Sequence, residues 1–153
     1  MTLHKKRCVV FFTEGETEDE FYGCLLNEIK ESYNVDRFNS DKIIKKCLKG
    51  ICRFDKKLIN KYEIEIKNKY KSYDIIVFLC YDTDYFEFSS KPSVDWNEVN
   101  DKLMLLGAKE VYHIKAEKCI EDFLLYDVDG ICNYLKIKKP GRIKGKNGVE
   151  KLD

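Results

Sequence analysis

The sequence predicts an α/β protein whose four-stranded, mainly parallel, Rossmann-like sheet lies between layers of helices. Two observations lead to this fold class. Residues 8–12 and 75–80 are continuous apolar runs, which are typical of strands covered on both faces, as in parallel sheets. After each run the apolar residues recur at helical spacing. Strands that alternate with helices predict a three-layer, doubly wound sheet.

The N-terminal half is predicted to form two strands, each followed by a helix. The first strand, residues 8–12, is followed by Thr13-Glu14-Gly15 and by a helix over about residues 17–32. Residues 42–48 are a weaker strand candidate closed by Gly50. The second helix is marked by apolar residues at helical spacing: Phe54, Leu58, Ile59, Tyr62 and Ile66.

The C-terminal half repeats the alternation and then changes character. Residues 75–80 are the clearest strand, and a polar loop containing Pro92 leads to a helix that Gly107 stops. Residues 110–114 form a short fourth strand, and helical spacing resumes after it. Residues 136–153 are rich in glycine and lysine and are predicted to be a loop or loose tail. The expected division is a domain over residues 1–127 and a helical extension with a basic tail over 128–153.

Composition excludes several classes of protein. Charged residues make up 36% of the chain but almost cancel, at a net charge of +1, so total charge does not predict nucleic-acid binding. Seven cysteines are scattered without a C-x-x-C pair, which predicts free thiols in a reducing compartment. The apolar run after the basic N-terminus is too short to be a signal or membrane segment. A cytoplasmic protein without membrane contact is expected.

Three carboxylates follow the two best strands. Glu14 comes directly after the first, and Asp82 and Asp84 come directly after the third. Because ligands bind outside the carboxyl ends of strands in open α/β sheets, these side chains should meet. Their mutual repulsion calls for a cation, and an oxygen-only ligand set favours Mg²⁺ or Mn²⁺.

Each acidic segment also has an ordinary explanation when it is taken alone. Thr17 and Glu20 have the spacing of a capping box, and acids in a first helical turn complement the helix dipole. Asp82-Thr83-Asp84 could be simple turn chemistry. Capping leaves Glu14 unexplained, since it precedes Gly15 at the strand edge. The two segments together are therefore more specific than either one alone.

Two segments resemble the signature motifs of the Toprim fold: Thr13-Glu14-Gly15-Glu16-Thr17-Glu18 and Tyr81-Asp82-Thr83-Asp84. The first, followed by an aromatic pair, is most similar to Toprim domains of OLD-type nucleases and RloB-like proteins of phage defence. Residues 120–125 resemble the acidic-aromatic segment that follows the fourth strand in those relatives. The resemblance covers roughly residues 7–127.

The resemblance implies metal-dependent hydrolysis of phosphodiester bonds in DNA or RNA, in phage defence or a mobile element. It makes Glu14 a metal ligand or general acid/base, and Asp82 and Asp84 metal ligands. It also makes Glu18, Glu121 and Asp122 candidate ligands. The chain has no Walker motif, so the ATPase half of OLD proteins is not expected in it. The expected partners are therefore a second copy of the chain, as a homodimer, or a separate ATPase or defence protein.

Two rival functions remain at this stage. Residues 78–84 also resemble the opening motif of haloacid-dehalogenase-like phosphatases, in which the first aspartate is the nucleophile. That fold begins with this strand, needs far more chain after it than is present here, and gives Glu14 no role. The second rival is a Toprim-like module that binds nucleic acid or protein without cutting.

Two basic segments are candidates for contact with phosphate. Residues 41–71 contain eleven basic and four acidic residues, although a lysine-rich helix face is often merely solvated. In the tail, glycines between basic residues would allow close approach of a phosphate backbone. The predicted nucleic-acid-binding residues are those of the tail: Lys138, Lys139, Arg142, Lys144 and Lys146. Among these, Lys144 or Lys146 could neutralise transition-state charge.

Overall fold

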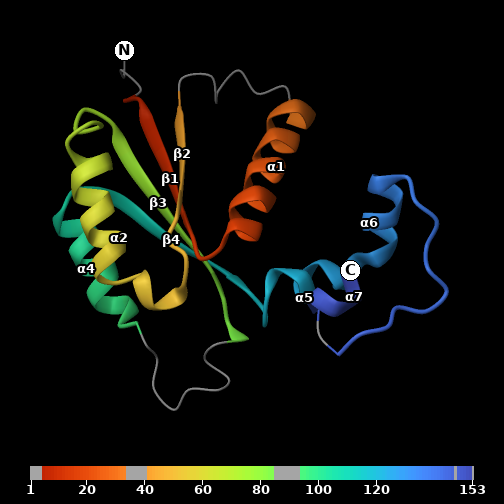
Figure 1. Cartoon of the computed structure of the whole chain (residues 1–153). Coiled ribbons are helices and arrows are strands. Elements are labelled where there is room, and N and C mark those ends of the chain that lie inside the picture. Colours follow the sequence, from red (N-terminus) through yellow and green to blue (C-terminus); the bar gives the residue numbers. More distant parts are fainter. Residues whose placement is uncertain (1–4, 34–40, 85–93, 147, 153) are drawn as a thin grey trace.

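The fold is a four-stranded parallel sheet with the strand order β2-β1-β3-β4. A computed structural model describes residues 5–33, 41–84, 94–146 and 148–152. Its strands are listed in chain order: β1 (Arg7–Thr13), β2 (Lys42–Cys47), β3 (Asp74–Asp82) and β4 (Ala108–Ala116). Figure 1 shows them side by side with helices on both faces. The predicted α/β class is confirmed, and the arrangement is compatible with a Rossmann-like or Toprim-like sheet.

The register brings the carboxyl ends of the strands to one edge. In β1, Thr13 pairs with Cys47 of β2 on one side and with Cys80 of β3 on the other. In β3, Asp82 pairs with Ala116 of β4. Glu14 and Asp82 therefore stand at the same edge, which is where sequence reasoning expected them.

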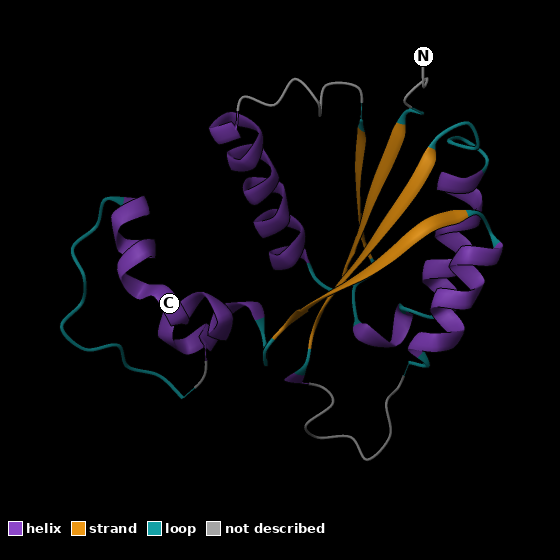
Figure 2. Cartoon of the chain, turned by 180° about the vertical axis from the view of Figure 1, so that it is seen from behind, coloured by secondary structure: helices purple, strands orange, loops and turns teal. Residues whose placement is uncertain are grey.

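The helices cover the two faces unequally. Helix α1 (Glu16–Tyr33) lies on one face, whereas α2 (Lys56–Lys61) and α4 (Trp96–Leu105) lie on the other (Figures 1 and 2). The second predicted helix, marked by Phe54 to Ile66, consists of α2 and then a π-helical segment, η3 (Tyr62–Lys67). A short 3-10 turn, η2 (Ile51–Arg53), precedes it.

The core on the α2/α4 face is much the larger of the two. It joins alternate residues of β1 and β3, such as Val10, Val77 and Leu79, to fully buried Leu58 and Leu103 from the two helices. This alternation explains the continuous apolar runs, because the intervening residues of each strand face α1.

The smaller core beneath α1 contains three buried residues, Phe11, Tyr22 and Cys80. It is organised by stacked aromatic rings. Phe11 of β1 stacks on Phe78 of β3 at 4.9 Å, and Phe78 stacks on Tyr112 of β4 at 5.2 Å. Tyr112 is 46% exposed, so one helix does not cover the whole of this face.

Strand β2 is weakly apolar because it lies at the edge of the sheet. Lys45 and Lys46 point to opposite faces, as successive strand residues must. Lys45 pairs with Asp19 of α1 at 3.0 Å, and Lys46 pairs with Glu65 of η3. Each lysine therefore lays its apolar stem along one face and ends in an ion pair with the layer that covers it.

The C-terminal part consists of short helices that stand beside the sheet (Figure 1). They are α5 (Ile120–Leu124), a 3-10 turn η4 (Leu125–Asp127), α6 (Val128–Leu135) and α7 (Gly148–Leu152). The prediction that residues 136–153 form only a loop or loose tail was wrong for α7. This helix packs on α5, where Gly148 lies against the backbone of Glu121 and Asp122. A side chain at position 148 would prevent that approach.

Several smaller predictions are corrected or fall outside the described residues. Helix α1 begins at Glu16, so Thr17 lies inside its first turn and is not the N-cap of a capping box. All seven cysteines lie within the described residues and none forms a disulfide, and Cys24 and Cys52 are exposed. The loop with Pro92 lies outside the described residues. Within the described ranges, no helix is long and apolar enough to cross a membrane.

Candidate metal centre

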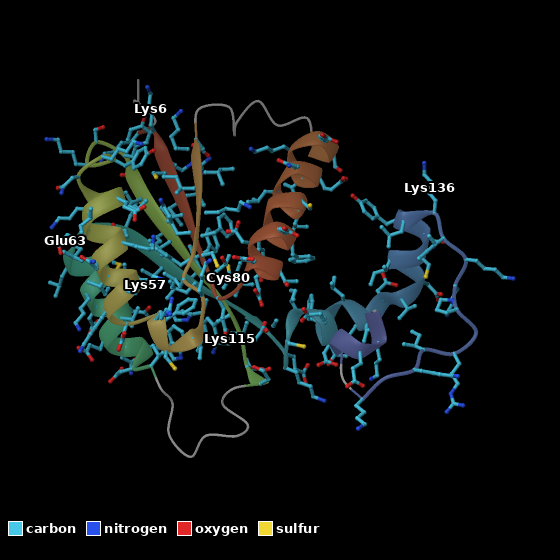
Figure 3. The ribbon with its side chains drawn as sticks, viewed as in Figure 1. Lys6, Lys57, Glu63, Cys80, Lys115 and Lys136 are labelled. Atoms are coloured by element: carbon cyan, nitrogen blue, oxygen red, sulfur yellow. The ribbon has the colours of Figure 1, made fainter. Side chains whose placement is uncertain are left out.

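Glu14 and Asp82 are held together at the carboxyl edge by the backbone. The Glu14 N–H donates to the Cys80 carbonyl at 3.2 Å, which continues the β1–β3 ladder by one residue. The Asp82 N–H in turn donates to Glu14 Oε2 at 3.2 Å. Figure 3 shows Cys80 at the centre, between the start of α1 and the sheet. Two rigid strands therefore bring these carboxylates together.

Glu18 reaches the same place from the first turn of α1. It is only 7% exposed, and Asp82 is only 9% exposed. A Cβ at Gly15 would lie 2.5 Å from Glu18 Oε2, so the glycine leaves room for this carboxylate to fold back toward the strand ends. Thr13 Oγ1 donates to Asp19 Oδ1 at 3.3 Å and ties the helix start to β1.

The electrostatics of this group are unfavourable without a cation. The pKa of Asp82 is raised to about 8, first by burial and then by the neighbouring charges of Glu18 and Glu14 and by a hydrogen bond with Glu18. Burial also raises the pKa of Glu14, while the Asp82 N–H lowers it and Glu18 and Asp84 raise it. The charges of Glu18 and Asp84 therefore disfavour the ionisation of both Glu14 and Asp82.

The residues fit a hard cation in their chemistry but do not yet enclose one. Every donor is an oxygen, and Asp82 Oδ1 is buried without a hydrogen-bond partner. Among the described residues, however, no group of three or more His, Cys, Asp or Glu side chains is placed to hold a metal ion. Glu14 Oε2 instead accepts a hydrogen bond from the backbone N–H of Asp82. The Glu14 side chain would have to turn for the carboxylates to share an ion.

The segment after Asp82 is fixed by the loop that follows β4. The N–H groups of Thr83 and Asp84 both donate to the Lys118 carbonyl at 2.9 Å. The Lys118 N–H donates to Thr83 Oγ1, also at 2.9 Å. Lys118 has φ of +62°, which turns its backbone back toward Thr83. Asp84 is exposed, and its charge contributes to the raised pKa values of Glu14 and Asp82. Sequence reasoning did not identify Thr83 or Lys118 as positioning residues.

An open cleft of about 470 Å³ lies beside these carboxylates. Its lining comes from three neighbouring segments: Glu14 and Gly15, residues Glu16, Thr17 and Glu18 of α1, and Lys49 with Gly50. Sequence reasoning included Lys49 only as one basic residue of the segment 41–71 and did not place it beside the carboxylates. The signal that could have found it is its position directly after β2, at the same edge of the sheet.

Glu121 and Asp122 are engaged in a different way. They lie in the first turn of α5, where the Cys119 thiol donates to Asp122 Oδ2 at 3.1 Å. Neither residue is among the groups that shift the pKa of Glu14 or Asp82. The structure therefore brings Glu14, Glu18, Asp82 and Asp84 together without these two, whose role as ligands stays a prediction.

The basic tail lies away from the carboxylates. Both views show residues 136–146 on the side of the C-terminal helices that is turned away from the sheet (Figures 1 and 2). Lys139 pairs with Asp129 of α6 at 2.6 Å, and the Lys146 N–H donates to Glu150 at 2.9 Å. Lys138, Arg142 and Lys144 are exposed. The tail is not brought to Glu14 or Asp82.

Comparisons with protein-family models, with curated proteins and with solved structures find no match to this chain. The Toprim resemblance therefore stays a prediction from the two motifs. What it implies for function enters below as a proposal.

Proposed function

We propose that this chain is a magnesium-dependent nuclease that hydrolyses phosphodiester bonds at the carboxyl edge of its sheet. One observation carries the proposal. A buried aspartate, Asp82, has an oxygen without a partner and a pKa raised by burial and by two neighbouring glutamates. Buried like charges are costly unless something positive joins them. Perturbed carboxylates at a cleft are also typical of functional sites.

In this proposal Glu14, Asp82 and Asp84 hold Mg²⁺ or Mn²⁺, and Glu18 is a further ligand. A bound divalent ion would polarise the phosphoryl oxygen and lower the pKa of water. The strand ends supply rigid attachment for Glu14 and Asp82, while the Thr83–Lys118 hydrogen bonds hold the backbone of Asp84.

The raised pKa of Glu14 suits proton transfer. Burial raises the pKa of Glu14 above that of a free glutamate, which is the direction that favours a group that accepts and returns a proton. A protein nucleophile is less suitable here. His113 is bonded to the Tyr81 hydroxyl at 3.1 Å and to Asn100 at 3.0 Å, so it does not activate a serine or cysteine. Water is therefore the proposed nucleophile.

A second candidate function is a module that binds nucleic acid or protein without cutting. One observation favours it, namely that the described side chains do not form a ready set of metal ligands. The two candidates differ in whether a divalent ion produces cleavage.

The deciding experiment measures cleavage of plasmid DNA, single-stranded DNA and structured RNA with Mg²⁺, with Mn²⁺ and with EDTA. We expect cleavage only with a divalent ion. Glu14→Gln should reduce the rate by more than about 100-fold, because loss of even an outer-shell partner of a metal typically costs 10–100-fold.

The matched control is Glu20→Gln, which makes the same change at an exposed position of α1. It should cleave like the unmodified protein. Cleavage in EDTA, or full activity in Glu14→Gln, would refute the proposal. Metal-dependent stabilisation without any cleavage would favour the binding module.

A further inference from the structure

Three basic side chains gather where β2 ends, directly beside the carboxylate cleft. The Leu48 carbonyl accepts hydrogen bonds from Lys57 Nζ at 2.8 Å and from Arg53 Nη1 at 3.4 Å. Lys49 is the next residue along the chain and lines the cleft itself. We call Lys49, Arg53 and Lys57 the basic cluster.

Two members of this cluster, Arg53 and Lys57, differ from the other lysines of the same segment in their partners. Lys49 pairs with the exposed Glu16 of α1 at 3.2 Å. Lys45, Lys46 and Lys61 each pair with a carboxylate within 3.2 Å. In the part of the chain that the structure describes, Arg53 and Lys57 form no such ion pair. Each donates instead to a neutral backbone carbonyl. Their positive charge is therefore left for another anion.

The charges of the cluster act on one another. Loss of contact with water lowers the pKa of Lys57, and the charges of Arg53, Lys61 and Lys49 lower it further. Cations held together in this way would be stabilised by an anion. Arg53 and Lys49 are exposed, so a large anion can reach them.

The backbone links the cluster directly to the proposed metal ligands. The Leu48 N–H donates to the Thr13 carbonyl at 2.9 Å, and the Gly50 N–H donates to the Glu14 carbonyl at 2.9 Å. Lys49 lies between these two bonds. Figure 3 shows Lys57 and Cys80 in the lower half of the α/β body, whereas Lys136 lies at the outer end of α6. The cluster thus adjoins the acidic edge, unlike the tail that the sequence favoured.

We infer that the basic cluster binds the phosphates of a nucleic-acid strand next to the bond held at the acidic edge. This identification of the ligand rests on the proposed phosphodiesterase function. The three cations come from a strand end, a 3-10 turn and a helix, so they spread over an open surface. A chain of phosphates engages such a surface through several charges at once, with release of counterions.

Phosphate contacts fix the position and direction of a strand and carry no base information. DNA and RNA therefore offer the cluster the same chemistry, and the experiment includes both. The cluster places the strand on the β2 side of the cleft. Its phosphates would approach Glu14 past Lys49.

The test compares three double variants that each remove two positive charges. Arg53→Gln with Lys57→Gln removes the cluster, and Lys138→Gln with Arg142→Gln removes charge from the tail. Lys67→Gln with Lys69→Gln is the matched control within the same basic segment, at the far end of η3. Binding of fluorescein-labelled single-stranded DNA and RNA is followed by anisotropy in EDTA, between 50 and 200 mM salt.

We expect the cluster variant to bind roughly 10–100-fold more weakly at 50 mM salt, with a salt slope smaller by about 1.4, as for the loss of two phosphate contacts on a single strand. The control and tail variants should bind like the unmodified protein. Arg53→Lys with Lys57→Arg keeps the charge and should restore binding if the cluster acts through phosphate. The melting temperatures of the cluster variant and the unmodified protein should be equal, which checks that loss of the hydrogen bonds to the Leu48 carbonyl has not disturbed the fold.

Equal binding by the cluster and control variants would overturn the inference, as would a loss confined to the tail variant. Failure of the unmodified protein to bind either nucleic acid would overturn it too. Because binding is measured without metal, these results are separate from the cleavage assay. A protein that binds through the cluster but never cleaves would disprove the nuclease and leave the phosphate site standing.

Discussion

Two pairs of acidic residues that were both candidate metal ligands from the sequence, Glu14 with Asp82 and Glu121 with Asp122, have opposite surroundings in the structure. Glu14 and Asp82 lie at strand ends, are partly or largely buried, and have pKa values raised by burial and by neighbouring carboxylates. Glu121 and Asp122 lie in the first turn of α5, next to the Cys119 thiol and the backbone of α7. The first pair lies among other carboxylates that disfavour its ionisation. In the second pair, Asp122 accepts a hydrogen bond from the nearby Cys119 thiol.

The difference shows what distinguishes a candidate metal site from helix-end chemistry. Acids in a first turn are stabilised by the helix dipole and by exposed backbone N–H groups. Asp82 has no such help for Oδ1, which is buried without a partner. This buried oxygen without a partner is the feature on which the proposal of a cation at Asp82 rests.

The largest expected difference between the pairs is their effect on stabilisation by magnesium. At an Mg²⁺ concentration ten times the dissociation constant, binding adds about 1.4 kcal/mol. For a chain of this size that raises Tm by roughly 3–6 °C. Asp82→Asn should abolish this shift in a thermal melt, and Asp122→Asn should retain it. An equal shift in both variants would place the ion elsewhere.

The next difference concerns pH. The folded-state pKa of Asp82, about 8, lies above its ordinary value of 3.8. The folded protein therefore binds a proton that the unfolded chain releases, so this stability is complete below about pH 4 and is lost as pH rises toward 8. In EDTA, Tm should fall between pH 5 and pH 8, and Asp82→Asn should flatten the fall.

Magnesium should reverse this trend, because metal binding requires deprotonated carboxylates and strengthens as pH rises. Asp122→Asn is again the comparison, and its pH profile should follow that of the unmodified protein. A profile for Asp82→Asn that falls as steeply as the original would show that Asp82 is not the group responsible.

The smallest expected effect is that of adding a methyl group to the glycine beside each acidic pair, Gly15 near Glu14 and Gly148 near Glu121 and Asp122. A methyl group at Gly15 meets only the flexible end of Glu18, so Gly15→Ala should leave Tm unchanged and weaken Mg²⁺ binding a few-fold. A methyl group at Gly148 meets the backbone of Asp122 and Glu121. Gly148→Ala should lower Tm and leave Mg²⁺ affinity intact. Isothermal titration and thermal melts together measure both quantities, and a swapped pattern would contradict the assignment.

The central strands were predictable because their residues are buried on both faces. Val10 and Val77 face the large core, and Phe11 and Phe78 face α1, so no polar residue interrupts either run. Helix α7 was not predictable. It is fixed by the approach of Gly148 to α5, a contact between segments far apart in sequence. Lys45 and Lys46 weakened the strand signal of β2, because charged residues interrupt its apolar pattern. Their partners, Asp19 of α1 and Glu65 of η3, are known only from the structure.

The acidic site was predictable only in part. The rule that strand ends meet at one edge places Glu14 and Asp82 together. Glu18 was named only through the resemblance, and the structure brings it to the same place through the space that Gly15 leaves. The basic cluster could not be read from residue order. Arg53 and Lys57 meet at the Leu48 carbonyl only because a 3-10 turn precedes α2.

The unequal cores on the two faces of the sheet have a consequence for motion. Helix α1 rests on a core of three buried residues, whereas α2 and α4 share the larger core with the central strands. Local unfolding begins where few apolar contacts are buried. If α1 detaches first, it takes Glu18 with it and leaves Glu14 and Asp82 on the sheet. An ion bound by Glu18 of α1 together with Glu14 and Asp82 of the sheet would oppose this detachment and slow amide hydrogen exchange along α1.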